Sequence, residues 1–214
     1  MRKSSIAHLR REYKNTGLTE RNAPRNPFPL FRRWFKEALK AHALDANALA
    51  LSTVTPSGNP AARMVLLKSF DPKGFVFFTN YQSRKGRELT RRPVACLLFF
   101  WPQLGRQVRV DGRVQRVSSK ESDAYFKTRP RGSQLGAWAS DQSRQVENRE
   151  ILEGRMRALV EKYRGKTIPR PSYWGGFRVI PAAIEFWKGR PNRLHDRLLY
   201  RKAGAEWVRT RLAP

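Results

Sequence analysis

The sequence predicts a mainly β protein with flanking helices, arranged as an antiparallel barrel rather than a parallel sheet. Short apolar segments recur at a spacing of roughly ten residues, separated by turn signals rich in Gly, Pro, Asn and Asp. Only a few segments between them show helical periodicity. Neither a GxGxxG motif nor a P-loop is present, so no Rossmann site and no nucleoside triphosphate site is indicated.

The first third of the chain predicts an arm, a helix and three strands. Residues 1–27 are polar, basic and interrupted by prolines, which favours an extended arm with one short helix over 4–13. From Pro29, apolar residues at helical spacing predict an amphipathic helix. Its inward positions would be Leu30, Trp34, Ala38, Leu39 and Ala41. Strands are expected at 48–55, 62–70 and 74–80, with turns at TPSGNP and DPKG.

The middle of the chain predicts a capped helix between strands. Ser83 is a candidate N-cap for a short helix over 83–92. The run VACLLFFW (94–101) predicts a strand covered on both faces, which would bury Cys96 as an inert thiol. Residues 106–117 alternate and predict a strand with a bulge near Gly112. Its inward residues would be Val108, Val110, Val114 and Val117.

The last part of the chain predicts two helices and a group of short strands. A helix would start at Ser118 or Ser119, with Glu121 in capping-box position. A longer charged helix would follow over 146–164. The remaining predicted strands are PSYWGGFRV, AAIEFW, LHDRLLYR and EWVRTRLAP, joined by tight turns. We expect residues 28–214 to form a single domain.

The amino-acid composition favours a globular protein without membrane-spanning helices. Apolar residues make up 40% of the 214 residues and charged residues 29%, which favours a globular fold over disorder. No apolar run approaches the roughly 18 residues of a membrane span, and the N-terminus lacks a signal-peptide core. We therefore expect a soluble cytoplasmic protein. A single cysteine excludes an intrachain disulfide, and three scattered histidines predict no metal site.

The net charge points to an anionic partner. Forty-four Lys and Arg residues against seventeen Asp and Glu give a formal charge of +27. Such a balance is typical of proteins that bind nucleic acid, a membrane surface or phosphorylated small molecules. The positive residues are spread over the whole chain, however, so part of the excess is expected to be solvated surface.

The segment GRPNRLHDR (189–197) concentrates three arginines and a histidine. If Arg193 to Tyr200 is a strand, then Arg193, His195 and Arg197 share one face and could clamp an anionic ligand. The alternative is an edge strand that carries charge to prevent aggregation.

Two further basic segments are candidate phosphate sites. In RMVLLK (63–68), Arg63 and Lys68 face opposite sides of a regular strand, so they need two anions or a bend; a solvent-exposed pair is the alternative. Arg84 and Lys85 follow Ser83 at a helix start, where backbone N–H groups attract phosphate. The alternative there is an ordinary capped helix.

A fourth segment, 125–143, combines hydroxyl, guanidinium and amide groups. Tyr125, Arg129 and Ser133 recur with a period of four and would share a face of a continuing helix, although Pro130 interrupts it. Gln142 and Ser143 add neutral groups suited to the edge of a heterocycle.

These motifs together resemble the pyridoxine/pyridoxamine 5′-phosphate oxidase family. The resemblance runs from about Arg10 to the C-terminus, in the family's order. It rests on RREY, RMVLLK, FFTN, SRKG, RQVRV, YFKTRPRGSQLGAWASDQS, PSYWGGFRV, IEFW, RLHDR and the terminal RLAP. It implies an FMN-binding split β-barrel of antiparallel, Greek-key type. It also implies a homodimer with FMN at the subunit interface.

The resemblance further implies an activity. Enzymes of this family oxidise pyridoxine or pyridoxamine 5′-phosphate to pyridoxal 5′-phosphate, with O2 reduced to hydrogen peroxide. The implied cofactor residues are Arg63, Met64, Val65, Leu66, Phe78, Thr79, Arg84, Lys85, Gln107, Gln142, Ser143, Trp187 and Arg197. The implied substrate residues are Arg10, Arg11, Glu12, Tyr13, Lys68, Tyr125, Arg129, Ser133, Arg193, Leu194 and His195. Arg197 and His195 would act at the reacting carbon, and Arg10 to Tyr13 would form a lid.

Two alternatives remain at this point. Another split-barrel flavin oxidase, of the phenazine-biosynthesis type, would share the FMN residues and differ in the substrate set. A basic nucleic-acid-binding protein would account for the charge without a flavin. We expect no membrane partner, and the phosphates of FMN and substrate make nucleic acid the weaker explanation.

Overall fold

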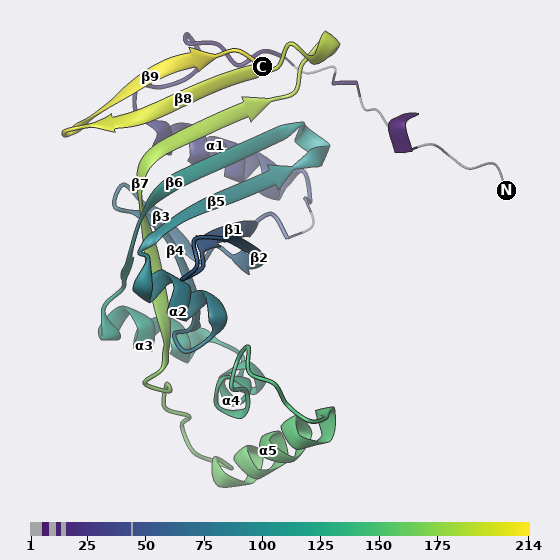
Figure 1. The fold of residues 1–214 in the computed structure, drawn as a ribbon, viewed down its shortest axis with the longest axis vertical. Helices are drawn as coiled ribbons and strands as arrows, with labels where there is room; N and C mark the ends of the chain where they lie inside the picture. Colours follow the sequence, from purple (N-terminus) through teal and green to yellow (C-terminus); the bar gives the residue numbers. More distant parts are fainter. Residues whose placement is uncertain (1–5, 9–11, 14–15, 44) are drawn as a thin grey trace, which may run out of the picture. The chain divides into compact units, whose positions relative to one another are not determined.

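The computed structural model describes residues 6–8, 12–13, 16–43 and 45–214. Within them lie nine strands, five α-helices and three short 3-10 helices (Figure 1). The strands are β1 (Ala48–Val54), β2 (Pro60–Leu66), β3 (Ser69–Asp71), β4 (Gly74–Asn80), β5 (Val94–Trp101), β6 (Arg106–Arg116), β7 (Trp174–Lys188), β8 (Asp196–Ala203) and β9 (Glu206–Leu212). The helices are α1 (Pro27–Lys40), α2 (Arg84–Arg91), α3 (Ser119–Thr128), α4 (Arg131–Ala139) and α5 (Arg149–Lys162), with 3-10 turns at Ile6–His8, Pro102–Leu104 and Pro191–Arg193. None of the described helices has the length and apolar character that a membrane span requires.

The strands form one nine-stranded sheet in the order β2-β1-β5-β6-β7-β4-β3, with β8 paired to β7 and β9 to β8. The pairs β3–β4, β4–β7, β7–β8 and β8–β9 are antiparallel. This confirms the predicted mainly β, antiparallel class. The chain divides into two compact units: unit 1 comprises the described residues of Met1–Leu49, Leu97–Asp111 and Ala182–Pro214, and unit 2 comprises Ala50–Cys96 and Gly112–Pro181.

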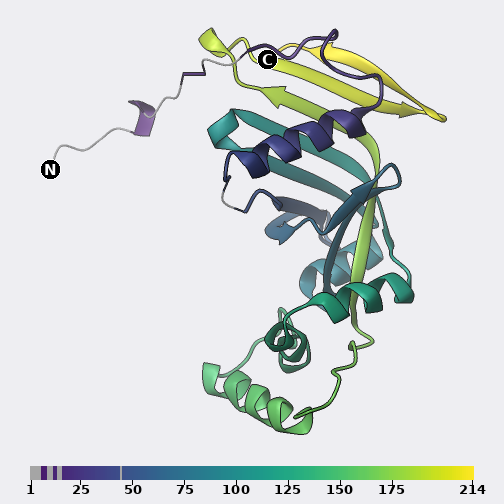
Figure 2. The ribbon, with the colours of Figure 1, turned by 180° about the vertical axis from the view of Figure 1, so that it is seen from behind.

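In unit 1, the buried side chains of α1 pack against the sheet, including the second half of β7, and form the core. Asn26 caps α1 by accepting a hydrogen bond from Phe28 N at 2.9 Å, and Pro27 occupies the first turn. The Trp34 ring meets Phe186 edge to face at 5.2 Å, on the strand face that α1 covers in Figure 2. Leu39 and Ala41 were expected to face inward but are exposed. Leu39 follows the buried Ala38 by one residue, and a rotation of about 100° takes it off the apolar stripe.

Unit 2 contains β4 and its antiparallel partner, the first half of β7. Phe75, Val76 and Phe77 of β4 are fully buried, because both faces of this strand are covered. A second apolar cluster includes residues of α3 and α4, and side chains of α5 pack against it. Its buried members are Phe126, Leu135, Ile168 and Trp174. The structure confirms the predicted helices over 83–92 and 146–164, as α2 and α5, to within three residues at each end.

Four predicted strands differ from the structure in their bounds or their burial. The strand expected over 62–70 breaks after Leu66 and resumes at Ser69, so the bend that Arg63 and Lys68 require is present. The strand 94–101 is not covered on both faces: Phe100 is 53% exposed and Cys96 is only partly buried, because alternate residues face solvent. PSYWGGFRV and AAIEFW are not two strands but the single long strand β7.

The short helix expected over 4–13 is a 3-10 turn at Ile6–His8 in the described part of that segment. The inward positions of β6 are confirmed at Val108, Val110 and Val114, whereas Val117 lies after the strand and is partly exposed. The helix expected at Ser118 or Ser119 begins at Ser119, because the Ser118 hydroxyl accepts a hydrogen bond from Glu121 N at 3.0 Å.

Candidate functional site

A cavity of about 740 Å³ lies in unit 2, within the size range of small-molecule sites. Residues of β2, β4, α2, α3 and α4 line it, together with the segments that join them. The predicted site residues among them are Met64, Val65, Leu66, Lys68, Phe78, Thr79, Lys85, Tyr125, Arg129, Ser133 and Gln142. Residues from five separate parts of the sequence therefore meet at one cavity.

One side of the cavity carries a polar triad from three elements. Thr79 Oγ1, at the end of β4, donates to Gln142 Oε1 at 3.1 Å. Lys85 Nζ, in the first turn of α2, lies 3.3 Å from both oxygens. Burial, and then the charge of Arg63, lower the pKa of Lys85. Both partners are neutral, so the ammonium charge of Lys85 is available to an anion.

The residues predicted to bind the substrate phosphate also line this cavity. Those in 125–133 lie not on one continuous helix, which was expected, but on two helices and the segment between them. α3 ends at Thr128 and α4 begins at Arg131, so Tyr125, Arg129 and Ser133 do not share one continuous helix. Pro130 lacks an N–H and disfavours helix at the residue before it, which explains the break. Lys68 reaches the cavity from the bend between β2 and β3, where its N–H donates to Val76 O.

An aromatic wall borders the phosphate residues. The rings of Phe78 and Tyr125 stack at 4.0 Å, and those of Phe78 and Trp174 at 5.6 Å. The Arg129 guanidinium lies 4.5 Å from the Trp174 ring. Its Nη1 atom is buried and has no hydrogen-bond partner among the described residues. Burial lowers the pKa of Arg129. A desolvated guanidinium with a free donor beside a cavity is suited to bind an anion.

Arg63 and Arg84 do not line the cavity and are held by a buried carboxylate. Arg63 on β2 contacts Glu88 at 2.9 Å, and Arg84 contacts the other carboxylate oxygen at 2.9 Å. Glu88 is 3% exposed and also accepts from Thr53 Oγ1 at 2.5 Å. The sequence analysis missed Glu88, although the i, i+4 spacing from Arg84 was a usable signal.

The helix start predicted as a phosphate site is capped as expected. Ser83 Oγ accepts from Gly86 N at 3.2 Å. A Cβ on Gly86 would lie 2.3 Å from Tyr81 O, so glycine is needed there for the close approach of α2 to the preceding segment.

Most of the remaining predicted residues belong to unit 1. The segment around Arg193 was wrongly expected to be part of a strand: Pro191–Arg193 forms a 3-10 turn, and β8 begins at Asp196. Asn192 and Arg193 have φ values of 55° and 61°, and this left-handed backbone ends strand geometry. The turn brings Arg190 N within 3.1 Å of His195 Nδ1.

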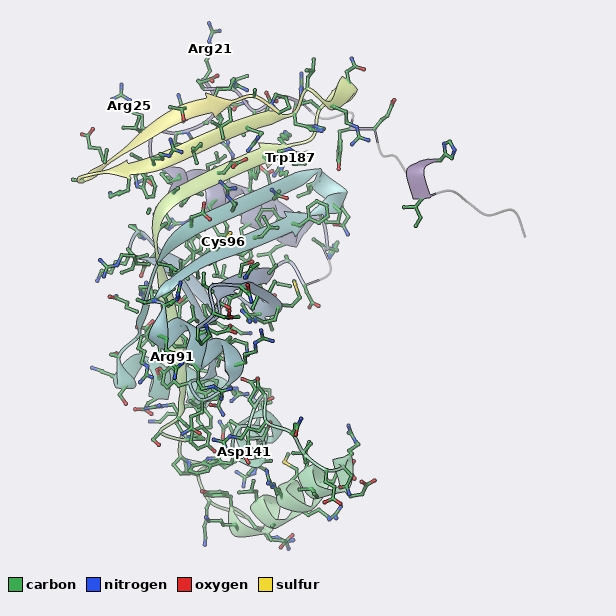
Figure 3. All side chains as sticks on the ribbon, viewed as in Figure 1. Arg21, Arg25, Arg91, Cys96, Asp141 and Trp187 are labelled. Carbon is green, nitrogen blue, oxygen red and sulfur yellow. The ribbon has the colours of Figure 1, made fainter. Side chains whose placement is uncertain are left out.

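His195 lies in an aromatic cluster. Its ring is 4.7 Å from that of Trp187, the β7 residue labelled in Figure 3, and 5.8 Å from that of Tyr13. A Cβ on Gly189 would lie 2.4 Å from the Tyr13 ring, so glycine allows this packing. Burial, and then the charge of Arg193, lower the pKa of His195. Because Nδ1 accepts the Arg190 N–H, the neutral imidazole carries its proton on Nε2.

Arg197 is fixed in unit 1 by Glu185, which the sequence analysis also missed. Its Nε donates to Glu185 Oε1 at 2.7 Å, and its Nη1 donates to Ala213 O at 3.0 Å. The hydrogen bond that Arg197 donates to the Glu185 carboxylate raises the pKa of Arg197. Glu185 is 4% exposed and also pairs with Arg109 at 3.1 Å.

Several predicted residues are not at the cavity. Ser143 has a φ of 70° and borders a second, smaller cavity of about 250 Å³ formed by the segment from Ser140 to Arg155. Arg10 and Arg11 lie outside the described residues. Those in unit 1 are Glu12, Tyr13, Gln107, Trp187, Arg193, Leu194, His195 and Arg197.

Comparison with known proteins adds to this geometry. Residues 35–163 match the family described as pyridoxamine 5′-phosphate oxidase, and residues 174–214 match the pyridoxine 5′-phosphate oxidase C-terminal dimerisation region. A pyridoxine/pyridoxamine 5′-phosphate oxidase from Gloeothece citriformis is 58% identical over 98% of this chain and 99% of its own.

Two solved structures share the fold. PhzG from Burkholderia lata, in complex with tetrahydrophenazine-1-carboxylic acid, superposes with a TM-score of 0.86 at 34% identity, covering 91% of this chain and 95% of its own. A pyridoxamine 5′-phosphate oxidase-related, FMN-binding protein from Nostoc punctiforme has a TM-score of 0.69 at 19% identity, covering 86% of this chain and 97% of its own. These likenesses confirm the predicted split-barrel fold.

Proposed function

Because the chain belongs to the pyridoxamine 5′-phosphate oxidase family of oxidoreductases, we propose that it oxidises pyridoxine and pyridoxamine 5′-phosphate to pyridoxal 5′-phosphate with FMN as cofactor. The observation that supports this most directly is the convergence of Lys68, Tyr125, Arg129 and Ser133 on one cavity that also holds Thr79, Lys85 and Gln142. The chain would act as a homodimer with FMN at the subunit interface, as the match to a dimerisation region supports.

The donors at the cavity fit a flavin mononucleotide. Lys85 offers a charged donor for a phosphate, and the Thr79 hydroxyl and Gln142 amide offer neutral groups suited to hydroxyl and heterocycle edges. The backbone from Met64 to Leu66 lines the same cavity. Arg63 and Arg84 would add charge to the phosphate end, and Gln107, Ser143, Trp187 and Arg197 would complete the flavin site.

The substrate phosphate would be held by the second group of residues. Arg129 Nη1 and Lys68 Nζ would donate to phosphate oxygens, with the hydroxyls of Tyr125 and Ser133 beside them. Binding energy from this remote group would fix the pose of the reacting carbon. Loss of Arg129 or Lys68 is therefore expected to act mainly on substrate binding.

FMN, when bound, would supply the acceptor for a hydride from the substrate C4′ carbon, with O2 as the final oxidant and hydrogen peroxide as its product. The hydroxyl proton of pyridoxine 5′-phosphate, or an amine proton of pyridoxamine 5′-phosphate, would pass to water, and for the amine a water molecule would then displace the nitrogen as ammonia. Arg197, fixed by Glu185, would stabilise negative charge that develops near the reacting carbon. His195 would donate through Nε2–H to a substrate oxygen and so orient the ring. Arg193 and Leu194 would cover the pyridine ring, and the segment from Arg10 to Tyr13 would close over it as a lid.

A visible spectrum of the purified protein under nitrogen tests the proposal. We expect a flavin absorption band, either at purification or after FMN is added, that bleaches on addition of pyridoxine 5′-phosphate. A flavin band that does not bleach would contradict the substrate assignment. A protein that takes up no FMN would contradict the cofactor assignment.

The likeness to PhzG favours a second candidate, a flavin oxidase of the phenazine-biosynthesis type. The two candidates differ in their substrate. The first acts on a phosphate ester, and the second would act on a phenazine carboxylic acid. Arg129 Nη1, which has no hydrogen-bond partner among the described residues, and Lys68 at the same cavity suit an anion. A phosphate and a carboxylate both supply that anion, so a direct substrate test decides between the two candidates. Bleaching by tetrahydrophenazine-1-carboxylic acid but not by pyridoxine 5′-phosphate would favour the second candidate.

The nucleic-acid alternative makes a different prediction. It requires retention on DNA that falls steeply with salt, in a protein without flavin. Flavin uptake together with weak, salt-sensitive DNA retention would leave the basic surface as a non-specific feature.

A further inference from the structure

Glu88 on α2 is a buried carboxylate with three side-chain partners from three elements. Its Oε1 accepts from Arg84 Nε at 2.9 Å, and its Oε2 accepts from Arg63 Nη2 at 2.9 Å and Thr53 Oγ1 at 2.5 Å. Thr53 in turn accepts from Arg63 Nη1 at 2.5 Å. Burial would by itself raise the pKa of Glu88, but the hydrogen bonds from Thr53 and Arg84 and the charge of Arg63 hold it below its ordinary value.

The two arginines of this network differ in how firmly they are held and in how exposed they are. The Arg63 side chain is 20% exposed and also donates to the carbonyls of Leu51 and Ala61. Arg84, by contrast, is 62% exposed and has Glu88 as its one ion-pair partner among the described residues. Glu88 therefore fixes the direction of both guanidiniums. Lys85, which lines the cavity, is close enough for the charges of Arg63 and Glu88 to shift its pKa.

We propose that Glu88 is a positioning residue that holds Arg63 and Arg84 in the geometry needed to receive the phosphate of the flavin cofactor. This inference rests on the proposed function. Glu88 does not touch the ligand; it acts through the two arginines. It also offsets the repulsion among Arg63, Arg84 and Lys85, three cations gathered near one point.

The substitution Glu88→Gln should change the affinity for FMN in opposite directions, depending on whether Glu88 positions the arginines or acts only through its charge. Removing a negative charge near an anion site strengthens anion binding if only Coulomb interactions matter. If Glu88 positions the arginines, its loss weakens binding, because the amide cannot accept from both guanidiniums and from Thr53 at once. Glu88→Asp adds a second test, since it keeps the charge but shortens the side chain by one methylene and cannot span the same partners.

The experiment measures the Kd of the apo-protein for FMN and for riboflavin by quenching of flavin fluorescence. Riboflavin has no phosphate, so it separates an effect at the phosphate from a general loss of structure. Glu121→Gln is the matched control, because it breaks a carboxylate pair with the mostly buried Arg178 in the same unit, away from the cavity. Thermal unfolding of each apo-protein reports on stability.

We expect Glu88→Gln and Glu88→Asp to raise the Kd for FMN by roughly ten- to hundredfold, which corresponds to the loss of about one charge-assisted hydrogen bond to the phosphate. The Kd for riboflavin should stay near that of Glu121→Gln. An unchanged or lower Kd for FMN in either variant overturns the inference, as does an equal loss for FMN and riboflavin. If Glu88→Gln does not fold, Glu88→Asp decides by the same criteria. A wild-type protein that binds no FMN contradicts the proposed function itself, which is a separate result from failure of the variants.

Discussion

At the scale of single residues, Arg129 carries the clearest prediction. Its guanidinium packs on Trp174 and its Nη1 is buried without a hydrogen-bond partner in the described part of the chain. Arg129→Ala should raise the KM for pyridoxine 5′-phosphate by about 10- to 100-fold with little change in kcat, because charge-assisted hydrogen bonds contribute about 1.5–3 kcal/mol. Steady-state peroxide formation measures both constants.

Lys127→Ala is the control for Arg129→Ala, because Lys127 is an exposed cation in the last turn of α3, two residues before Arg129, and does not line the cavity. Its KM should stay within about twofold of wild type. A fall in kcat with an unchanged KM in Arg129→Ala would show that the arginine serves the chemical step and not phosphate binding.

The residues that sequence reasoning missed are the counter-charges. Glu88 and Glu185 each fix an arginine that the resemblance had identified, Arg63 and Arg197. Glu88 lies 25 positions from Arg63, and Glu185 lies 12 positions from Arg197. No local spacing rule joins Glu88 to Arg63 or Glu185 to Arg197; the local signal was the i, i+4 spacing of Arg84 and Glu88. The capping residues Ser83 and Ser118 act within three residues and were predictable.

At the scale of elements, β7 shows where prediction from sequence stops. Two strands were predicted over the segment that β7 occupies, and Pro181 lies between them; proline cannot donate to a sheet ladder. In the structure β7 pairs with β4 up to Val179 and with β8 from Ala183, so Pro181 falls where the strand changes partner. Figure 1 shows β8 and β9 as a hairpin that follows the second half of β7. Partner exchange depends on contacts distant in sequence, which periodicity does not report.

The approach of β6 to β7 supplies a prediction at this scale. A Cβ on Gly112 would lie 2.1 Å from Ile180 O, a backbone atom that cannot move aside cheaply. Gly112→Ala should therefore lower the free energy of unfolding by about 2 kcal/mol or more, measured by denaturant titration. A change of less than about 0.5 kcal/mol would mean that the two strands separate freely at this point.

Gly154→Ala is the control for this strand contact. Gly154 lies inside α5, where a Cβ would meet only the end of the Arg157 side chain at 3.9 Å. Alanine has the higher helix propensity, so this variant should be more stable by up to about 1 kcal/mol. The two glycines should thus respond with opposite signs.

At the scale of the whole molecule, the formal charge of +27 makes each carboxylate an important counter-charge. Many described acidic residues pair with arginine, among them Glu37, Asp71, Asp123, Asp141 and Asp196. The phosphates of cofactor and substrate would account for part of the excess charge in unit 2.

The ion pair between Glu20 and Arg211 provides a prediction of how stability depends on pH. Arg211 on β9 donates to Glu20 at 2.8 and 2.9 Å and to Leu18 O at 2.9 Å, so it holds the N-terminal segment within unit 1. The hydrogen bond from Arg211 lowers the pKa of Glu20 from 4.5 to about 2. A carboxylate whose pKa is lower in the folded state stabilises the fold above its unfolded pKa and loses that contribution as the pH falls through its folded pKa.

Glu20→Gln should therefore be less stable than wild type by about 0.5–1 kcal/mol above pH 5, a modest amount because the carboxylate is 49% exposed and screened by solvent. The difference should shrink between pH 4.5 and about 2, as the wild-type carboxyl becomes protonated. Denaturant titrations of both proteins across this range measure it, with the exposed Glu206→Gln as control. A difference that persists unchanged at pH 2 would show that Glu20 contributes by packing and not by its charge.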